Sequence, residues 1–318
     1  MTTIQINPII VPKNTGQLKS INFYLVIIEE KVILIDAGED NQQCWDALFK
    51  KLKEIRLNIH DIDAILLTHN HSDHTGLVNA IRKIHDVPVY AHKDAIIRLK
   101  RERTFLETRV KFYENLFKEM GCGEEADKQV QRLKSAIDEN AHHTIKGEII
   151  SFEEGDSLYG FDIYEVPGHA PDHVMFWHNK SNSMFVGDHI LKNSPTNALV
   201  ECDQLGNMLP TLMIYEQSLK KLQSFDVEKS YPGHGELIKN TYTEVEGKLD
   251  RIEKKGERIK QKLTEPKTAA QIAKEMYGVR YDTLFPLIMS EIVGHLDRLQ
   301  NLNEITVEKD EGIFYFSS

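Results

Sequence analysis

Residues 65–76, with the sequence ILLTHNHSDHTG, constrain this chain more than any other stretch. An apolar run ends there in four side chains that can bind a metal ion: His69, His71, Asp73 and His74. Imidazole and carboxylate groups are the ligands that suit zinc and neighbouring first-row metals. Because side chains alternate along an extended segment, His69 and His71 can point the same way. The other two lie where a helix predicted over 75–84 begins, so one loop can serve two metal ions.

Three more predicted strands end in a possible ligand beside a glycine. These strand ends read Val166-Pro167-Gly168-His169, Phe185-Val186-Gly187-Asp188-His189 and Tyr231-Pro232-Gly233-His234. Each motif alone is a weak signal. Together with the first cluster they form an ordered set at the same end of successive strands, and that set is specific.

The first 240 residues alternate predicted strands with predicted helices. Strands are expected over 21–28, 31–35, 64–67, 87–92, 148–152, 161–166, 173–178, 184–187 and 227–231, and helices over 45–55 and 212–222. The short connections between them indicate layered α/β construction.

Residues 93–146 interrupt this order with a predicted helical hairpin. Apolar side chains recur at helical spacing on both sides of the turn Gly121-Cys122-Gly123. The first helix is rich in cations: Arg98, Lys100, Arg101, Arg103, Arg109 and Lys111. Two interpretations stay open, a solvated face whose stems pack on apolar surface and a lid whose cations attract an anionic substrate.

From residue 243 onwards the pattern is that of a small helical domain. A charged helix over 245–263, a helix over 269–276 behind a Thr268/Gln271 capping box, a helix over 284–299 and a hairpin over 305–316 are expected. This is the order of a winged helix. Its last helix carries Glu291 and Asp297 with only Arg298 in support, so we expect packing or homodimer formation rather than DNA binding.

The bulk composition narrows the classes of function. With 39 basic and 49 acidic residues among 318, the formal net charge is −10, which argues against a general nucleic-acid binder. The three cysteines are scattered without a CxxC pair, so a disulfide framework is not expected. The N-terminus lacks the features of a signal peptide, and no apolar run reaches the roughly 18 residues that span a bilayer. We therefore expect a cytoplasmic protein without membrane contact.

The chain resembles the metallo-β-lactamase superfamily over about residues 4–240. Five family motifs match in order: Asp36, the His69-x-His71-x-Asp73-His74 signature, His169, Asp188 and His234. The resemblance implies a four-layer αββα sandwich, in which helices cover two facing sheets and metals bind at one edge. We expect this domain over 1–242, with the hairpin inserted, and a winged-helix-like domain over 243–318. That tail is similar to the one on the branch that contains the β-lactamase-like-2 ribonucleases.

The same resemblance implies a dinuclear metal site. Metal one would be held by His69, His71 and His169, metal two by Asp73, His74 and His234, and Asp188 would bridge them. Asp36 would orient the ligands from behind. Two divalent ions are expected, with zinc favoured and manganese or iron as alternatives.

The implied chemistry is metal-assisted hydrolysis by a metal-bridging hydroxide, because coordination lowers the pKa of water from about 15.7 to about 7. Asp73 and His173 are the candidate catalytic residues. Asp73 would accept a hydrogen bond from the hydroxide and help protonate the leaving group, and His173 is either a proton donor or a structural group. Residues 192–212, including Ser194 and Asn197, are expected to border the pocket.

Three functions compete for this site. The favoured one is hydrolysis of a small-molecule ester, thioester or lactone, with an anionic substrate if the hairpin is a lid. The alternative is a phosphodiesterase or endoribonuclease, which the tail allows and the negative charge disfavours. A regulatory or interaction protein with an incidental metal site is the third, although an idle site has no reason to keep seven ligand groups.

Overall fold

The computed structural model describes residues 4–13, 18–193 and 198–318, and these form two compact units. The first consists of the described residues of Met1–Lys100, His143–Thr196 and Ser218–Val245. The second consists of those of Arg101–His142, Asn197–Gln217 and Glu246–Ser318. The division falls within α7 (Thr211–Leu222) and α8 (Thr241–Lys260). Ser194 and Asn197, expected beside the pocket, lie outside the described residues.

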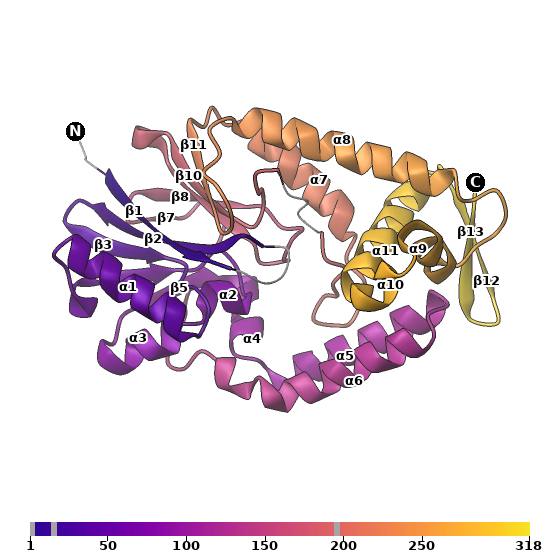
Figure 1. The fold of residues 1–318 in the computed structure, drawn as a ribbon, viewed down its shortest axis with the longest axis horizontal. Coiled ribbons are helices and arrows are strands. Elements are labelled where there is room, and N and C mark those ends of the chain that lie inside the picture. The colour runs from indigo at the N-terminus through magenta and orange to yellow at the C-terminus, as the bar shows by residue number, and fades with distance from the viewer. Residues whose placement is uncertain (1–3, 14–17, 194–197) are drawn as a thin grey trace. The chain divides into compact units, whose positions relative to one another are not determined.

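A six-stranded sheet with the order β1-β2-β3-β4-β5-β6 forms one layer of the first unit (Figure 1). Its strands are β1 (Ile4–Pro12), β2 (Ser20–Ile28), β3 (Lys31–Ile35), β4 (Ala64–Leu66), β5 (Val89–His92) and β6 (Ile150–Phe152). The first three pair antiparallel, and β4, β5 and β6 add in parallel to β3. The carboxyl ends of β3 and β4 therefore meet at one edge of the sheet.

A five-stranded sheet with the order β11-β10-β9-β8-β7 forms the facing layer. Its strands are β7 (Ser157–Leu158), β8 (Phe161–Glu165), β9 (Val174–His178), β10 (Ser183–Gly187) and β11 (Lys229–Pro232). Only the β10–β11 pair is parallel. These two strands therefore also end at a common edge.

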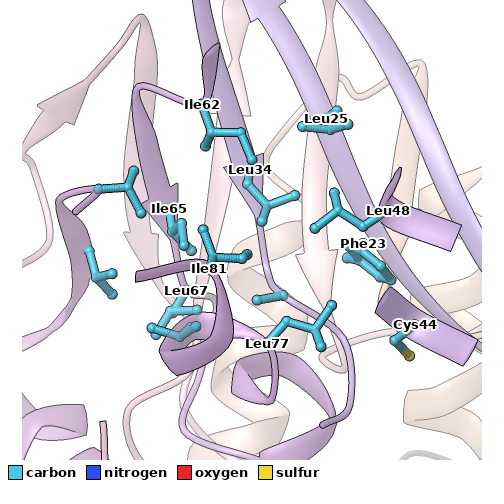
Figure 2. Close-up of a cluster of buried hydrophobic side chains, with 14 of the residues drawn as sticks. Phe23, Leu25, Leu34, Cys44, Leu48, Ile62, Ile65, Leu67, Leu77 and Ile81 are labelled. Carbon is cyan, nitrogen blue, oxygen red and sulfur yellow. The ribbon is translucent and has the colours of Figure 1, made fainter. Parts of the chain in front are cut away.

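Alternate side chains of β2 enter two different cores. Phe23 and Leu25 pack with side chains of the helices outside the first sheet (Figure 2). Tyr24 and Val26 point the opposite way and pack with aromatic side chains of β8, β9 and β10. Because neighbouring side chains on a strand point to opposite faces, a strand that is apolar throughout is buried on both sides. The expected α/β sandwich with a helical C-terminal region is confirmed.

The helices of the first unit are short apart from α1. They are α1 (Gln42–Glu54), α2 (Ser72–Thr75), α3 (Val78–Ile84) and α4 (Ile96–Leu99). The prediction of one helix over 75–84 is wrong, because the structure has two helices there, α2 and α3, with a break between them. At the break, the N–H of Gly76 donates to the carbonyl of Gly38 at 2.8 Å. A Cβ on Gly76 would lie 2.1 Å from the backbone nitrogen of Asp40. Close contact with this loop interrupts the helix.

The second unit joins the predicted hairpin to the C-terminal helices around one core. Its elements include α5 (Arg103–Glu119), α6 (Glu124–Glu139), α9 (Ala269–Tyr277), α10 (Arg280–Thr283), α11 (Phe285–Asn301), β12 (Thr306–Asp310) and β13 (Ile313–Ser317). The rings of Phe117 on α5 and Phe285 on α11 lie 5.0 Å apart between centroids. The capping box of Thr268 and Gln271 is confirmed at the start of α9. Among the described residues, no helix has the length and apolar character needed to cross a membrane.

Candidate metal centre

The seven side chains predicted to bind metal converge in the first unit, where strands of the two sheets end. They follow β4 (His69, His71, Asp73 and His74), β8 (His169), β10 (Asp188) and β11 (His234). The parallel β10–β11 pair places its two ligands side by side, because parallel strands end at the same edge. The structure therefore brings together every predicted ligand.

His69, His71 and His169 form the first ligand group. Nδ1 of His71 lies 3.0 Å from Nε2 of His69 and 3.0 Å from Nε2 of His169. Nitrogens bound to one tetrahedral zinc at about 2.0–2.1 Å are roughly 3.3 Å apart. The spacing of this group fits the coordination sphere of a single ion.

Asp73, His74 and His234 form the second ligand group, whose donor atoms lie within 4.8 Å of one another. The carboxylate of Asp188 faces both groups. Its Oδ1 is 3.4 Å from Nε2 of His74, and its Oδ2 is 3.1 Å from Nε2 of His234. The same Oδ2 is 3.5 Å from Nε2 of His169.

Several buried atoms of this cluster lack a hydrogen bond. Among the described residues, Nε2 of His74, Nε2 of His234 and Oδ1 of Asp188 have no hydrogen-bond partner. One unsatisfied buried polar atom costs about 1–3 kcal/mol, so three such atoms together indicate a binding site for a cation. The donor set of imidazoles and carboxylates fits a divalent first-row metal.

The electrostatics of the cluster agree with this assignment. Burial and the neighbouring imidazoles hold the pKa of His69 well below its usual value, which keeps the ring in the neutral, ligating form. Burial raises the pKa of Asp188, but His74 and His234 outweigh it and hold that pKa well below the usual value. Asp188 is therefore an ionised carboxylate.

Two buried acceptors set the orientation of the second group. Oδ2 of Asp36 lies 2.8 Å from Nδ1 of His74, and the carbonyl of Ser20 lies 2.7 Å from Nδ1 of His234. Each ring thereby directs its Nε2 towards Asp188. Asp36 lies where the resemblance places it. Ser20 and Thr68, whose backbone N–H donates to Asp36 at 2.8 Å, were not predicted, because backbone carbonyl and N–H groups leave no distinctive pattern in a sequence.

His173 lies behind the ligands rather than among them. Its side chain is fully buried, and its Nε2 accepts a hydrogen bond from the backbone N–H of Asp188 at 3.0 Å. Burial and nearby imidazoles hold its pKa well below the usual value. This contact orients Asp188 and leaves Nε2 unable to donate a proton.

Two of the basic side chains on the first helix of the hairpin form ion pairs with carboxylates of the second unit. Arg103 lies 2.9 Å from Glu107 and 2.9 Å from Asp138. Nε of Arg109 lies 2.9 Å from each carboxylate oxygen of Glu201. Cations that are already paired with carboxylates are less available to an anionic substrate. These ion pairs therefore favour the first interpretation, a solvated face whose stems pack on apolar surface, over the substrate lid.

Comparison with known proteins agrees with the geometry. Residues 16–234 match the family model of the metallo-beta-lactamase superfamily. The probable metallo-hydrolase YqjP of Bacillus subtilis (strain 168) is 30% identical over 294 residues, which cover 91% of each chain. An atrochrysone carboxyl ACP thioesterase of Aspergillus fumigatus is 25% identical over 244 residues, covering 76% of this chain and 59% of that relative. The crystal structure of a metallo-beta-lactamase family protein from Thermus thermophilus, TTHA1429, has a TM-score of 0.78 at 21% identity, and 98% of both chains is covered.

The fold and the histidine–aspartate site define a metal-dependent hydrolase. The chain belongs to the metallo-β-lactamase superfamily.

Proposed function

We propose that the chain hydrolyses a small-molecule ester, thioester or lactone with two divalent metal ions. The proposal depends on one observation, the position of Asp188 between Nε2 of His169 at 3.5 Å and Nε2 of His234 at 3.1 Å. A structural zinc site has about four ligands, and seven groups exceed that number. We assign metal one to His69, His71 and His169, metal two to Asp73, His74 and His234, and the shared position to Asp188.

Bound divalent metals polarise a carbonyl oxygen and lower the pKa of water from about 15.7 to about 7, which supplies a nucleophile at neutral pH. Asp73 has the exposure that proton transfer needs, because its side chain is 22% exposed whereas that of His234 is 2% exposed. Burial raises the pKa of Asp73, but His74, His234 and His71 together outweigh it and lower that pKa, so the carboxylate is ionised and can accept a proton. His173 has a positioning role in this scheme, since it holds the backbone of Asp188.

The acyl class of substrate is supported by the thioesterase among the relatives, whose named activity is on a thioester carbonyl. The net charge of −10 disfavours a polyanionic nucleic acid. A phosphodiester is the second candidate, because the same metals would polarise a phosphoryl oxygen.

A parallel screen separates these substrates. It compares nitrophenyl esters, thioesters, lactones, bis-nitrophenyl phosphate and single-stranded RNA on one preparation. Turnover of an acyl substrate is expected, and turnover of RNA alone contradicts the proposal.

Metal analysis and one matched pair of variants test the site. Protein purified with metal present should hold two ions per chain, and one or none contradicts the dinuclear assignment. Asp188→Ala should abolish turnover. Asp162→Ala, which removes an exposed carboxylate hydrogen-bonded to Ser157 on the same unit, should not.

A further inference from the structure

Two side chains outside the ligand set connect the loops of the first ligand group. Asn70 stands between His69 and His71 in the sequence, and Asp172 stands directly before His173 and three positions after His169. Nδ2 of Asn70 donates a hydrogen bond to Oδ1 of Asp172. This hydrogen bond joins two segments that are 102 positions apart in the chain.

The bond continues an antiparallel pairing of the two segments. The N–H of Val174 donates to the carbonyl of Thr68 at 2.9 Å. Asn70 and Asp172 lie two residues further along, one forward from Thr68 and the other back from Val174. In an antiparallel pair these positions are opposite each other. The side chains therefore hold the two loops together at the level of the ligands.

Burial of Asp172 indicates a role beyond stability. The residue is 1% exposed, and its Oδ2 has no hydrogen-bond partner among the described residues. Burial raises the pKa of Asp172, whereas the Arg98 guanidinium and the Asn70 amide lower it. A carboxylate is costly to bury, and the hydrogen bond that Asp172 accepts comes from the loop that carries His69 and His71.

We propose that Asn70 and Asp172 are positioning residues that set the distance between the His69–His71 loop and His169, so that the first group closes on one metal ion. The two side chains touch no reacting atom and act through the histidines beside them. The proposal presupposes the metal centre described under the proposed function.

Zinc affinity, measured by competition with a chromophoric chelator, tests this role. Outer partners of metal ligands contribute about 10–100-fold to metal affinity. Asn70→Leu and Asp172→Leu should weaken one of the two zinc sites by about that factor and leave the other within about threefold. Thermal unfolding of each metal-free variant is recorded in parallel, because a merely structural role would lower that midpoint without weakening one site selectively.

Exchanging the two residues, Asn70→Asp with Asp172→Asn, tests the positioning role even where a leucine variant fails to fold. Asn70→Asp places two carboxylates opposite each other and should weaken the same site. Adding Asp172→Asn restores one donor and one acceptor with the direction reversed, and should recover most of the affinity. A double variant that binds zinc no better than Asn70→Asp alone would overturn the proposal.

Asn79 provides a matched control in the same unit. Its side chain donates to the carbonyl of Thr144 at 2.9 Å and accepts from the N–H of Lys146 at 2.9 Å, so it also joins two distant segments. Asn79→Leu should leave both zinc affinities unchanged. An equal loss of affinity in this control would overturn a specific role for Asn70 and Asp172.

The outcome is distinguishable from failure of the proposed function. Wild-type protein that binds fewer than two zinc ions contradicts the dinuclear centre itself. Wild-type protein that binds two ions, together with Asn70 and Asp172 variants of unchanged affinity, contradicts the positioning role alone.

Discussion

Oδ2 of Asp36 lies 2.8 Å from Nδ1 of His74, and the two side chains are only 4% and 1% exposed. The other carboxylate oxygen accepts the N–H of Thr68 at 2.8 Å. Asp36 has a φ of 57°, a left-handed conformation that Asp and Asn adopt more readily than most residues. The carboxylate therefore holds the proton of His74 on Nδ1 and leaves Nε2 to face Asp188.

Asp36→Asn should weaken metal binding by about 10–100-fold while the fold is retained. Asparagine tolerates the left-handed backbone. Its single oxygen is needed by the N–H of Thr68, so its amide group faces Nδ1 of His74. The ring must then accept at Nδ1 and carry its proton on the atom that should bind metal. Chelator competition measures the effect, and an unchanged affinity would show that Asp36 does not set the tautomer.

Gly187→Ala should destabilise the protein by roughly 2–4 kcal/mol. Its φ is 46°, and a Cβ would lie 2.7 Å from Nε2 of His173 and 2.8 Å from Oγ1 of Thr68. Gly155→Ala is the control, because that glycine has a φ of 91° with nothing within 4 Å of a Cβ. The free energy of unfolding of the control should fall by only about 1–2 kcal/mol, the cost of placing alanine in a left-handed backbone conformation. Urea unfolding of the metal-free proteins measures both, and equal losses would exclude the clash.

The ion pair of Arg109 and Glu201 should respond asymmetrically to substitution. Side-chain exposure is 30% for Arg109 and 6% for Glu201. Arg109→Met leaves a buried carboxylate without its cation and should cost about 3 kcal/mol. Glu201→Gln leaves a guanidinium that water can reach and should cost about 1 kcal/mol. Urea unfolding gives both values, and a larger loss for Glu201→Gln would contradict this assignment of burial.

His295 should make the protein sensitive to mild acid. Burial, assisted by Lys255 and Arg298 and opposed by Glu216, lowers the pKa of His295 from 6.5 to about 3. Between these values the unfolded chain binds a proton that the folded chain does not, so stability falls as the pH falls. At pH 5 the loss is about 2 kcal/mol relative to pH 7.

The variant His295→Gln isolates this contribution. Urea unfolding at pH 7 and pH 5 should show a smaller loss for the variant than for the wild type. The other titrating groups are common to both proteins and cancel in the difference. Equal losses would show that His295 is not the acid-sensitive group.

The sequence by itself determined the chemistry of the site. Imidazoles and carboxylates at predicted strand ends can be recognised without a structure, because the type of metal ligand is a property of the side chain itself. The capping box of Thr268 and Gln271 was equally readable, since both partners lie within one turn of helix. The alternation of Phe23 and Tyr24 between two cores likewise follows from the local geometry of a strand.

Only the tertiary structure decided what lies around those ligands. The break after α2 depends on contact between Gly76 and the loop at Gly38, and the support of His234 comes from Ser20, 214 positions away. The pairing of Arg109 with Glu201 spans 92 positions. Contacts of this kind arise from the packing of distant segments, and no local pattern of residues specifies them.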